Sequence, residues 1–106
     1  MALGQAGAAV AAHYHRSADG AEEVVAAARA AGGRALTVQA DVAQAAQVHA
    51  MIDAVIAEWG RLDILVCNAG LMDREPFLEM TDDLWRRVIE TNLYGTFICA
   101  QAAARQ

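Results

Sequence analysis

The chain has 106 residues, of which 57% are hydrophobic, and this proportion is too high for a disordered chain, so a packed core is expected. Its formal net charge is -5, and its scattered arginines are outnumbered by acids, which excludes a basic surface for nucleic acid. Lysine is absent, which excludes a Schiff base or a phosphate-loop site within these residues.

The first half of the chain predicts two strands with a helix between them. Gly7 matches the C-terminal cap of a helix, because glycine adopts the left-handed conformation at little cost. Gly32 and Gly33 would stop the later helix, and Arg29 near its end suits the helix dipole. The predicted elements are the strand 8–14, the helix 21–31 and the strand 36–40.

The second half predicts two amphipathic helices around one buried strand. Apolar residues recur at helical spacing over 48–59, and Gly60 would end that helix. The apolar run 64–67 is typical of a strand covered on both faces. Thr81 matches the N-cap of a helix that runs almost to the end of the chain. The alternation predicts an α/β fold with a parallel sheet flanked by helices, and both chain ends are expected to cut through helices.

Small or polar residues follow two of the predicted strands. Asn68, Ala69 and Gly70 come directly after the third strand, and Asp41 and Val42 end the second. Doubly wound folds bind ligands at the carboxyl ends of parallel strands, where small residues let a ligand approach the backbone. The alternatives are a plain turn after the third strand and a helix N-cap after the second.

Two further polar positions are candidates for binding or catalysis. Arg16, followed by Ser17, lies in the turn after the first strand, where a guanidinium could grip a phosphate; a solvated loop charge is the alternative. Asn92 falls on the apolar face of the last helix, where an unpartnered amide is costly. Either a buried polar network or a functional site would explain it.

No metal site, membrane segment or secretion signal is predicted. His13, His15 and His49 lack metal-ligand spacing. Cys67 and Cys99 lack C-x-x-C spacing and are interpreted as buried thiols, which favours a reducing compartment such as the cytoplasm. No apolar run reaches membrane length, and the first residues do not have the pattern of a signal peptide. No membrane or nucleic-acid partner is therefore expected.

Taken in order, these segments resemble the short-chain dehydrogenase/reductase family over practically the whole chain. The stretch 61–70, R-L-D-I-L-V-C-N-A-G, is similar to the family's fourth strand and its Asn-Ala-Gly motif. The stretch 85–97, W-R-R-V-I-E-T-N-L-Y-G-T-F, is similar to the helix that bears its active-site asparagine. The resemblance implies a partial Rossmann-type three-layer fold over 1–106, a single partial NAD(P)-binding domain without the first strand and the C-terminal half.

The resemblance implies binding roles for the residues at the strand ends. Asp41 and Val42 would flank the adenine ring of the cofactor. Asn68, Ala69 and Gly70 would form the wall beside the adenine ribose and steady the central sheet.

The resemblance also implies a catalytic residue and a cofactor preference. Asn92 would be the asparagine that distorts its helix and holds a water in the proton relay. NAD-preferring relatives usually place an acid after the strand that corresponds to 8–14. Here Tyr14 is followed by His15, Arg16 and Ser17, and a cation without an acid suits the 2'-phosphate of NADP; NAD stays open.

The chain departs from the family's pattern at several catalytic positions. It contains no T-G-x-x-x-G-x-G turn for the pyrophosphate, no catalytic serine in the expected strand and no Tyr-x-x-x-Lys pair. Of the catalytic tetrad only Asn92 is present. We therefore expect this chain by itself to be inactive and to bind no measurable NADP.

The implied parent enzyme transfers a hydride between NADP(H) and a carbonyl or secondary alcohol. It looks most like a 3-oxoacyl-carrier-protein reductase or a glucose dehydrogenase, with a small-molecule substrate and a homo-oligomeric state, dimer or tetramer. The alternatives are a non-catalytic truncated member that acts as an interaction module, and a gene fragment with no role of its own. A receiver or flavodoxin-like domain shares the alternation of strands and helices. A receiver domain also needs an acidic cluster after its first strand and a lysine, and this chain has neither.

The order of strands predicts how the isolated chain behaves. In a doubly wound sheet the first strand lies between the second and the fourth, so its absence would expose unpaired backbone groups and apolar surface. We expect the isolated chain to be marginally stable, molten or associating. The segments at Asp41, Asn68 and Asn92 are expected to converge on one crevice.

Overall fold

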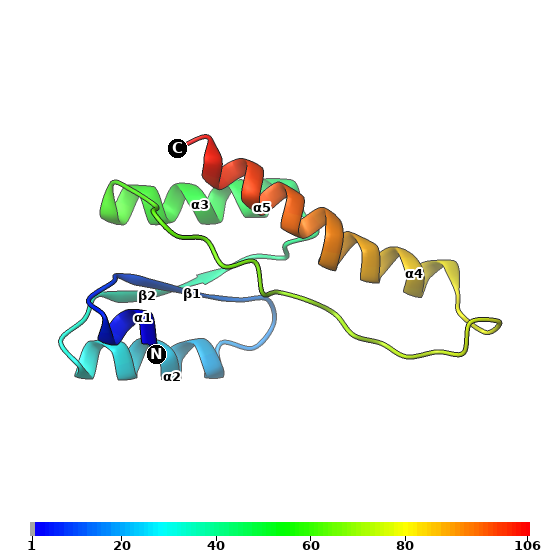
Figure 1. Ribbon diagram of the computed structural model, residues 1–106, viewed down its shortest axis with the longest axis horizontal. Coiled ribbons are helices and arrows are strands. Elements are labelled where there is room, and N and C mark those ends of the chain that lie inside the picture. The colour runs from blue at the N-terminus through cyan, green and yellow to red at the C-terminus, as the bar shows by residue number, and fades with distance from the viewer. Residues whose placement is uncertain (1) are drawn as a thin grey trace. The chain divides into compact units, whose positions relative to one another are not determined.

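The computed structural model describes residues 2–106, which divide into a first compact unit up to Ala40 and a second from Asp41 to Gln106. The chain is α/β, and helices flank its two parallel strands along the sequence (Figure 1). In order, the elements are α1 (Ala2–Gln5), β1 (Val10–Tyr14), α2 (Asp19–Ala30), β2 (Ala35–Gln39), α3 (Ala45–Trp59), α4 (Asp82–Ile89), the π-helix η1 (Glu90–Tyr94) and α5 (Gly95–Ala104).

The first unit is a strand-helix-strand motif with two parallel strands. The register runs from Val10 opposite Ala35 to Tyr14 opposite Gln39. Parallel strands need a crossover connection, and α2 provides it and packs against both strands (Figure 1). The apolar cluster between helix and sheet consists of Val10, Ala12, Val25, Ala28 and Ala35.

Glycines end the helices of the first unit as the sequence predicts. Gly7 follows α1 with a φ of +90°, and its N–H donates to the carbonyl of Gly4 at 3.0 Å. Gly32 follows α2 with a φ of +80°. The predicted boundaries move by one or two residues, since α2 begins at Asp19 and β1 at Val10. Such shifts are expected because end residues have few periodic neighbours to define them.

The second unit is built on the packing of α3 against α5. The apolar stripe predicted for α3 is its buried face, and Gly60 ends this helix with a φ of +76°. Gly60 N–H donates to the carbonyl of Ile56 at 2.7 Å, as in a left-handed cap. The buried residues on the two helices are Val48, Met51, Ile52, Val55, Gly95, Ile98, Cys99 and Ala102.

The helices α4 and α5 are joined without a break through the π-helix η1. Thr81 is the N-cap that the sequence predicts, and its Oγ1 accepts a hydrogen bond from Leu84 N at 3.2 Å. In η1 the N–H of Gly95 reaches back to the carbonyl of Glu90, five residues earlier. The predicted distortion at Asn92 is confirmed, because Asn92 lies within this π-helix.

The strand predicted at 64–67 is wrong. Within residues 2–106 the sheet contains only β1 and β2, and no strand pairs with 64–67. Ile64 is 60% exposed and Val66 is 67% exposed. An apolar extended segment becomes a strand only when a neighbour accepts and donates its backbone hydrogen bonds. The apolar side chains of this segment are therefore exposed, and not covered on both faces as the apolar run predicted.

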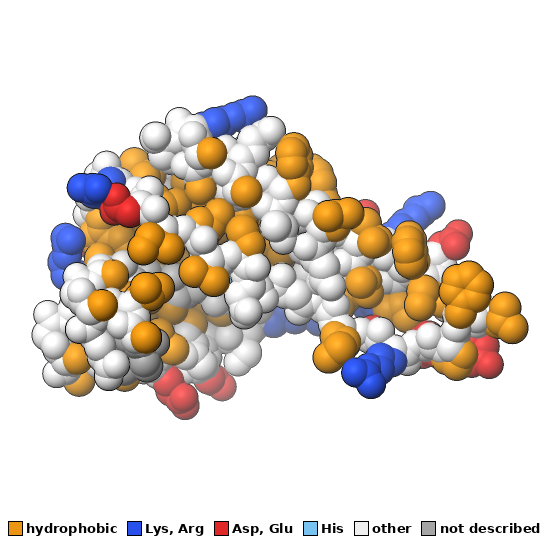
Figure 2. Space-filling view, in the orientation of Figure 1, with side chains coloured by type: hydrophobic (Ala, Val, Ile, Leu, Met, Phe, Trp, Pro, Cys, Tyr) orange, Lys and Arg blue, Asp and Glu red, His pale blue; other side chains and the backbone are white. Residues whose placement is uncertain are grey.

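The apolar stripe predicted along α4, η1 and α5 is only partly buried. Leu84 is buried, whereas Trp85, Leu93 and Phe97 are 58%, 66% and 56% exposed. Figure 2 shows hydrophobic side chains on the surface along α4 and the loop before it. The prediction of two buried thiols is wrong for Cys67, which is exposed with the segment that carries it. None of the helices described over 2–106 has the length and apolar character that a bilayer crossing needs.

Candidate functional site

The side chain of Asn92 clamps the π-helix to the segment that follows the Asn-Ala-Gly motif. Leu71 N donates to Asn92 Oδ1 at 2.7 Å, and Asn92 Nδ2 donates to Leu71 O at 2.9 Å. One backbone residue thus satisfies both ends of the amide. Because Asn92 is exposed, the alternative of a buried polar network is wrong. The amide fixes the position of the chain one residue after Gly70.

Thr96 completes the hydrogen bonding of Asn92. Its Oγ1 donates to the backbone carbonyl of Asn92 at 2.8 Å. Back-bonding of this kind, from threonine to the residue four positions earlier, bends helices. It therefore favours the distortion at η1. The sequence analysis did not select Thr96. A threonine four residues after Asn92 could have indicated this hydrogen bond, because a threonine hydroxyl can reach the carbonyl four positions earlier in a helix.

A close approach at Gly95 brings the segment after β2 against the same helix. A Cβ at Gly95 would lie 2.9 Å from Val42 Cγ2 and 3.1 Å from the carbonyl oxygen of Val42. These separations are too short for any side chain, so the packing of Val42 requires glycine here. The sequence marked Gly95 only as a weak point of the helix; a glycine inside a helix was the indication of close packing.

Three predicted segments therefore meet within the second unit. Val42 contacts Gly95, and Leu71 forms a hydrogen bond with Asn92. A Cβ placed on Gly70 would lie 3.5 Å from Asn92 Oδ1. The motif residues Asn68, Ala69 and Gly70 are all exposed beside this junction. The segments that contain Val42 and Gly70 thus both lie against the helix that carries Asn92, and the single crevice expected between them stays a prediction.

Asp41 shapes the turn that leads from β2 toward α3. Its Oδ1 accepts a hydrogen bond from Ala43 N at 3.0 Å, and its own N–H donates to Gln47 Oε1 at 2.8 Å. The alternative that Asp41 is the helix N-cap is wrong, because Gln44 holds that position.

Arg16 and Ser17 lie in the exposed turn between β1 and α2 of the first unit. The guanidinium of Arg16 forms no hydrogen bond or ion pair with any residue in the described part of the chain. Its donors are exposed, which fits both the predicted contact with an anionic group and the alternative of a solvated loop charge. These two residues belong to the first unit, whereas the convergence above is formed by the second.

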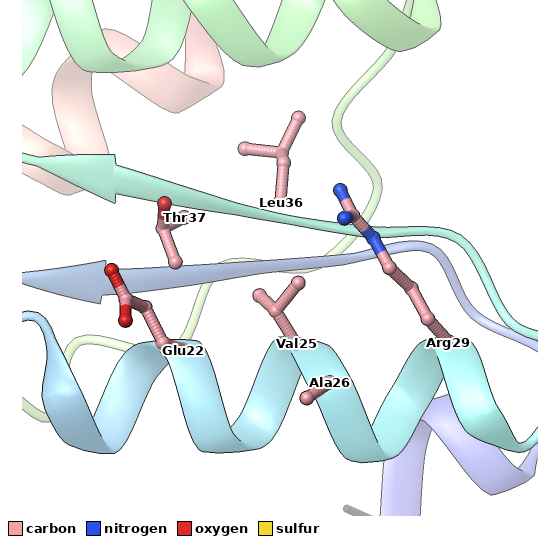
Figure 3. A pocket seen from close by; sticks show the side chains of 6 residues that line it. All are labelled: Glu22, Val25, Ala26, Arg29, Leu36 and Thr37. Carbon is pink, nitrogen blue, oxygen red and sulfur yellow. The ribbon is translucent and has the colours of Figure 1, made fainter.

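An open groove of about 370 Å³ lies between α2 and β2 in the first unit (Figure 3). Arg29 stands at one end of it and donates from Nε and Nη2 to the carbonyl of Ala35 at 3.1 and 2.8 Å. No predicted site residue lines this groove, and no metal-binding cluster occurs among the residues described. The lining residues are Glu22, Val25, Ala26, Arg29, Leu36 and Thr37.

Comparison with known proteins agrees with this fold. The parallel strand-helix-strand motif and the solved structures similar to it define an α/β protein of the Rossmann class. A family model described as short chain dehydrogenase matches residues 1–106. The chain belongs to the short-chain dehydrogenase family.

Similar proteins include both enzymes and solved structures. An uncharacterized oxidoreductase of Methylorubrum extorquens is 42% identical over 98% of this chain and 42% of its own length. A 3-oxoacyl-(acyl-carrier-protein) reductase of Staphylococcus aureus is 41% identical over 100% of this chain and 43% of its own length. A short chain dehydrogenase of Burkholderia cenocepacia, solved in complex with NADP, superposes with a TM-score of 0.95 and 38% identity, covering 99% of this chain and 43% of that one. The chain thus spans about two-fifths of the length of these relatives.

Proposed function

We propose that residues 1–106 form part of the NAD(P)-binding domain of an oxidoreductase that transfers a hydride between NADP(H) and a carbonyl or secondary alcohol. The observation that carries this proposal is the junction of Val42, Gly95, Asn92 and Leu71 in a chain of the short-chain dehydrogenase family. The bound nicotinamide would supply or accept the hydride. This chain's own residues would bind and orient the cofactor.

The residues around the junction fit a dinucleotide in their chemistry. Asn68, Ala69 and Gly70 offer small side chains and exposed backbone, which suits a flat ribose wall. Asp41 carries a carboxylate and Val42 is an apolar residue buried next to it, and this pair would border the adenine ring as the family resemblance implies. We assign these five residues to the adenosine half of the cofactor.

Asn92 is proposed as the catalytic residue that this chain contributes. Its side chain is occupied by Leu71 and its carbonyl accepts from Thr96, so its part is to hold the distorted helix beside the nicotinamide end of the site. A carbonyl oxygen has two lone pairs, so the Asn92 carbonyl can hold a water beside the Thr96 hydroxyl. The tyrosine and lysine that would move the proton are not among these residues.

NADP is the proposed cofactor because an arginine, and no acid, lies within the first four residues after β1. Arg16 has its donors available in an exposed turn, and Ser17 adds a hydroxyl next to it. A guanidinium binds a phosphate through two parallel hydrogen bonds. The similar Burkholderia cenocepacia structure with NADP supports this choice.

The decisive experiment is a cofactor and substrate assay on the protein with every residue its gene encodes. We expect oxidation of NADPH with 3-oxoacyl thioesters of the acyl carrier protein, the class in the name of the Staphylococcus aureus relative, and slower reduction of NADP with glucose. Arg16→Ala is expected to raise KM for NADPH about tenfold, the loss of one good ionic hydrogen-bond pair, and to leave KM for NADH unchanged. No turnover of either cofactor with carbonyls or alcohols would refute the proposal.

A second proposal, supported by the exposed apolar residues, is association of copies through α4, η1 and α5. Leu93 and Phe97 stand exposed on this helix, and apolar patches of this kind mark interfaces. Phe97→Glu should lower the molar mass measured by light scattering from dimer or tetramer toward monomer. Leu78→Asp is the matched control, because Leu78 is 94% exposed in the loop before α4. Unchanged mass in both variants would remove this proposal.

A further inference from the structure

The helix α5 of the second unit contains Cys99, and Cys67 contacts the same helix. Cys67 is exposed, and its Sγ lies 4.0 Å from the backbone carbonyl oxygen of Thr96 in α5. Cys99 lies three residues further along α5. Residues three apart on a helix are neighbours, with Cβ atoms about 5–6 Å apart. The Cys67 thiol therefore stands over the turn that carries Cys99.

The two thiols differ in their surroundings. Cys99 is buried, whereas Cys67 is exposed. Burial, and secondly the charge of the neighbouring Cys67 sulfur, raise the pKa of the Cys99 thiol. The geometric link between them is the approach of Cys67 Sγ to the Thr96 carbonyl, one turn before Cys99. The pair thus contains one accessible thiol and one protected thiol.

From this geometry we propose that Cys67 and Cys99 are a redox modification site, which closes to an intramolecular disulfide in the presence of a small disulfide oxidant such as oxidised glutathione. Neither cysteine has a part in the proposed hydride transfer. The bond would tie the residue directly before Asn68 to α5. It would hold the exposed segment 64–67 against the helix.

The reaction proceeds by two exchanges in which atoms and electrons balance. The Cys67 thiolate attacks one sulfur of oxidised glutathione, forms a mixed disulfide and releases one glutathione thiolate. The Cys99 sulfur then attacks the Cys67 sulfur, loses its proton to solvent and releases the second glutathione. The two cysteines lose two hydrogens in total, and one glutathione disulfide is reduced to two glutathione molecules. Cys67 reacts first because it is accessible.

Mass spectrometry of tryptic peptides tests the proposal on the protein as its gene encodes it. Cleavage after arginine separates the two cysteines, because Cys67 lies in the peptide 62–74 and Cys99 in the peptide 88–105. After equilibration in a glutathione redox buffer, we expect these peptides to be linked. The linked fraction gives the effective concentration of one thiol at the other. This concentration should be at least about tenfold higher in native protein than in urea, because the fold brings the two thiols together.

Variants separate this pair from random oxidation. Cys67→Ser and Cys99→Ser should each abolish the linked peptide and leave only a glutathione adduct on the remaining thiol. A thiol on another side of α5, in Cys99→Ala with Gln101→Cys, should link at least about tenfold less, because two residues turn a helix by about 200°. Equal linking in native and urea-treated protein, or only intermolecular bonds and adducts, would overturn the proposal.

Discussion

At the scale of single residues, the hydrogen bonds of one asparagine define the candidate site. Asn92 both donates to and accepts from the backbone of Leu71. A side-chain amide can do both at once, because it carries an acceptor oxygen and a donor nitrogen on one carbon, spaced to meet the C=O and N–H of one backbone residue. The position of the segment after Gly70 therefore depends on the amide and not on size or polarity alone.

Replacement of Asn92 should free the backbone amide of Leu71. Asn92→Ala removes the acceptor of the Leu71 N–H, and a hydrogen bond of this kind stabilises by about 0.5–1.5 kcal/mol. The hydrogen exchange rate of the Leu71 amide should therefore rise about two- to tenfold. Asn92→Asp keeps an acceptor for Leu71 N but places a second oxygen against Leu71 O. The aspartate variant should therefore exchange between wild type and alanine. Exchange at Leu71 that is the same in all three proteins would show that the clamp does not form.

Alanine at Gly95 should destabilise the second unit. The new Cβ would lie 2.9 Å from Val42 Cγ2, and overpacking of this kind costs about 1–3 kcal/mol, more than the helix propensity that alanine adds. Urea unfolding, or exchange of the α5 amides, measures the loss. Gly20→Ala is the control, since nothing lies within 4 Å of its Cβ position in α2, and it should stabilise by about 0.5–1 kcal/mol. A stabilised Gly95→Ala protein would contradict the close packing.

At the scale of elements, the helix from α4 to α5 begins with a cap and changes its winding at η1. Thr81 fixes the first turn, and acidic residues there, Asp82 and Asp83, suit the positive end of the helix dipole. The π-turn then rotates the residues after it relative to those before. Asn92 can therefore face Leu71 while Gly95 faces Val42 on one helix.

Loss of the cap should loosen the first turn of α4. Thr81→Ala removes the acceptor for Leu84 N, and loss of such a cap costs about 1 kcal/mol. Thr81→Ser keeps the hydroxyl and should behave like wild type. Hydrogen exchange of the Leu84 amide measures the difference, expected to be about fivefold between alanine and serine. Equal protection in both variants would mean that the hydroxyl does not hold the turn.

At the scale of the whole molecule, exposed apolar surface governs how the 106-residue chain behaves by itself. Ile64, Val66, Leu93 and Phe97 are each more than half exposed, and each would gain by burial. Backbone groups over 64–67 have no partner strand within residues 2–106. Both features favour association over a stable monomer.

The isolated chain should therefore be marginally stable or associated, and should not bind NADP measurably. Size-exclusion chromatography with light scattering, amide exchange and calorimetric titration with NADP measure these three properties. A monomer that melts cooperatively, with protected amides at 64–67, would contradict this expectation, because it would show that the backbone groups of this segment have hydrogen-bond partners. The same measurements on the protein with all its encoded residues provide the comparison.

Local patterns were sufficient for most elements because their causes are local. The stripe of α3, the glycines at 7, 32 and 60, and the cap at Thr81 each depend on residues within one or two turns. The family motifs at 61–70 and 85–97 likewise pointed to the family and to the distorted helix at Asn92.

The predictions that needed distant partners were the ones decided by the tertiary structure. A continuous apolar run at 64–67 predicts a strand, but pairing is a property of two segments, and no described segment pairs with this one. Burial of Cys67 was wrong for the same reason, and the contacts of Leu71 and Thr96 with Asn92 were not foreseen. The sequence by itself determined the family, the helices and their ends, because neighbouring residues encode these. Only the tertiary structure decided which side chains and strand edges found partners, because hydrogen bonding and burial join residues far apart in the chain.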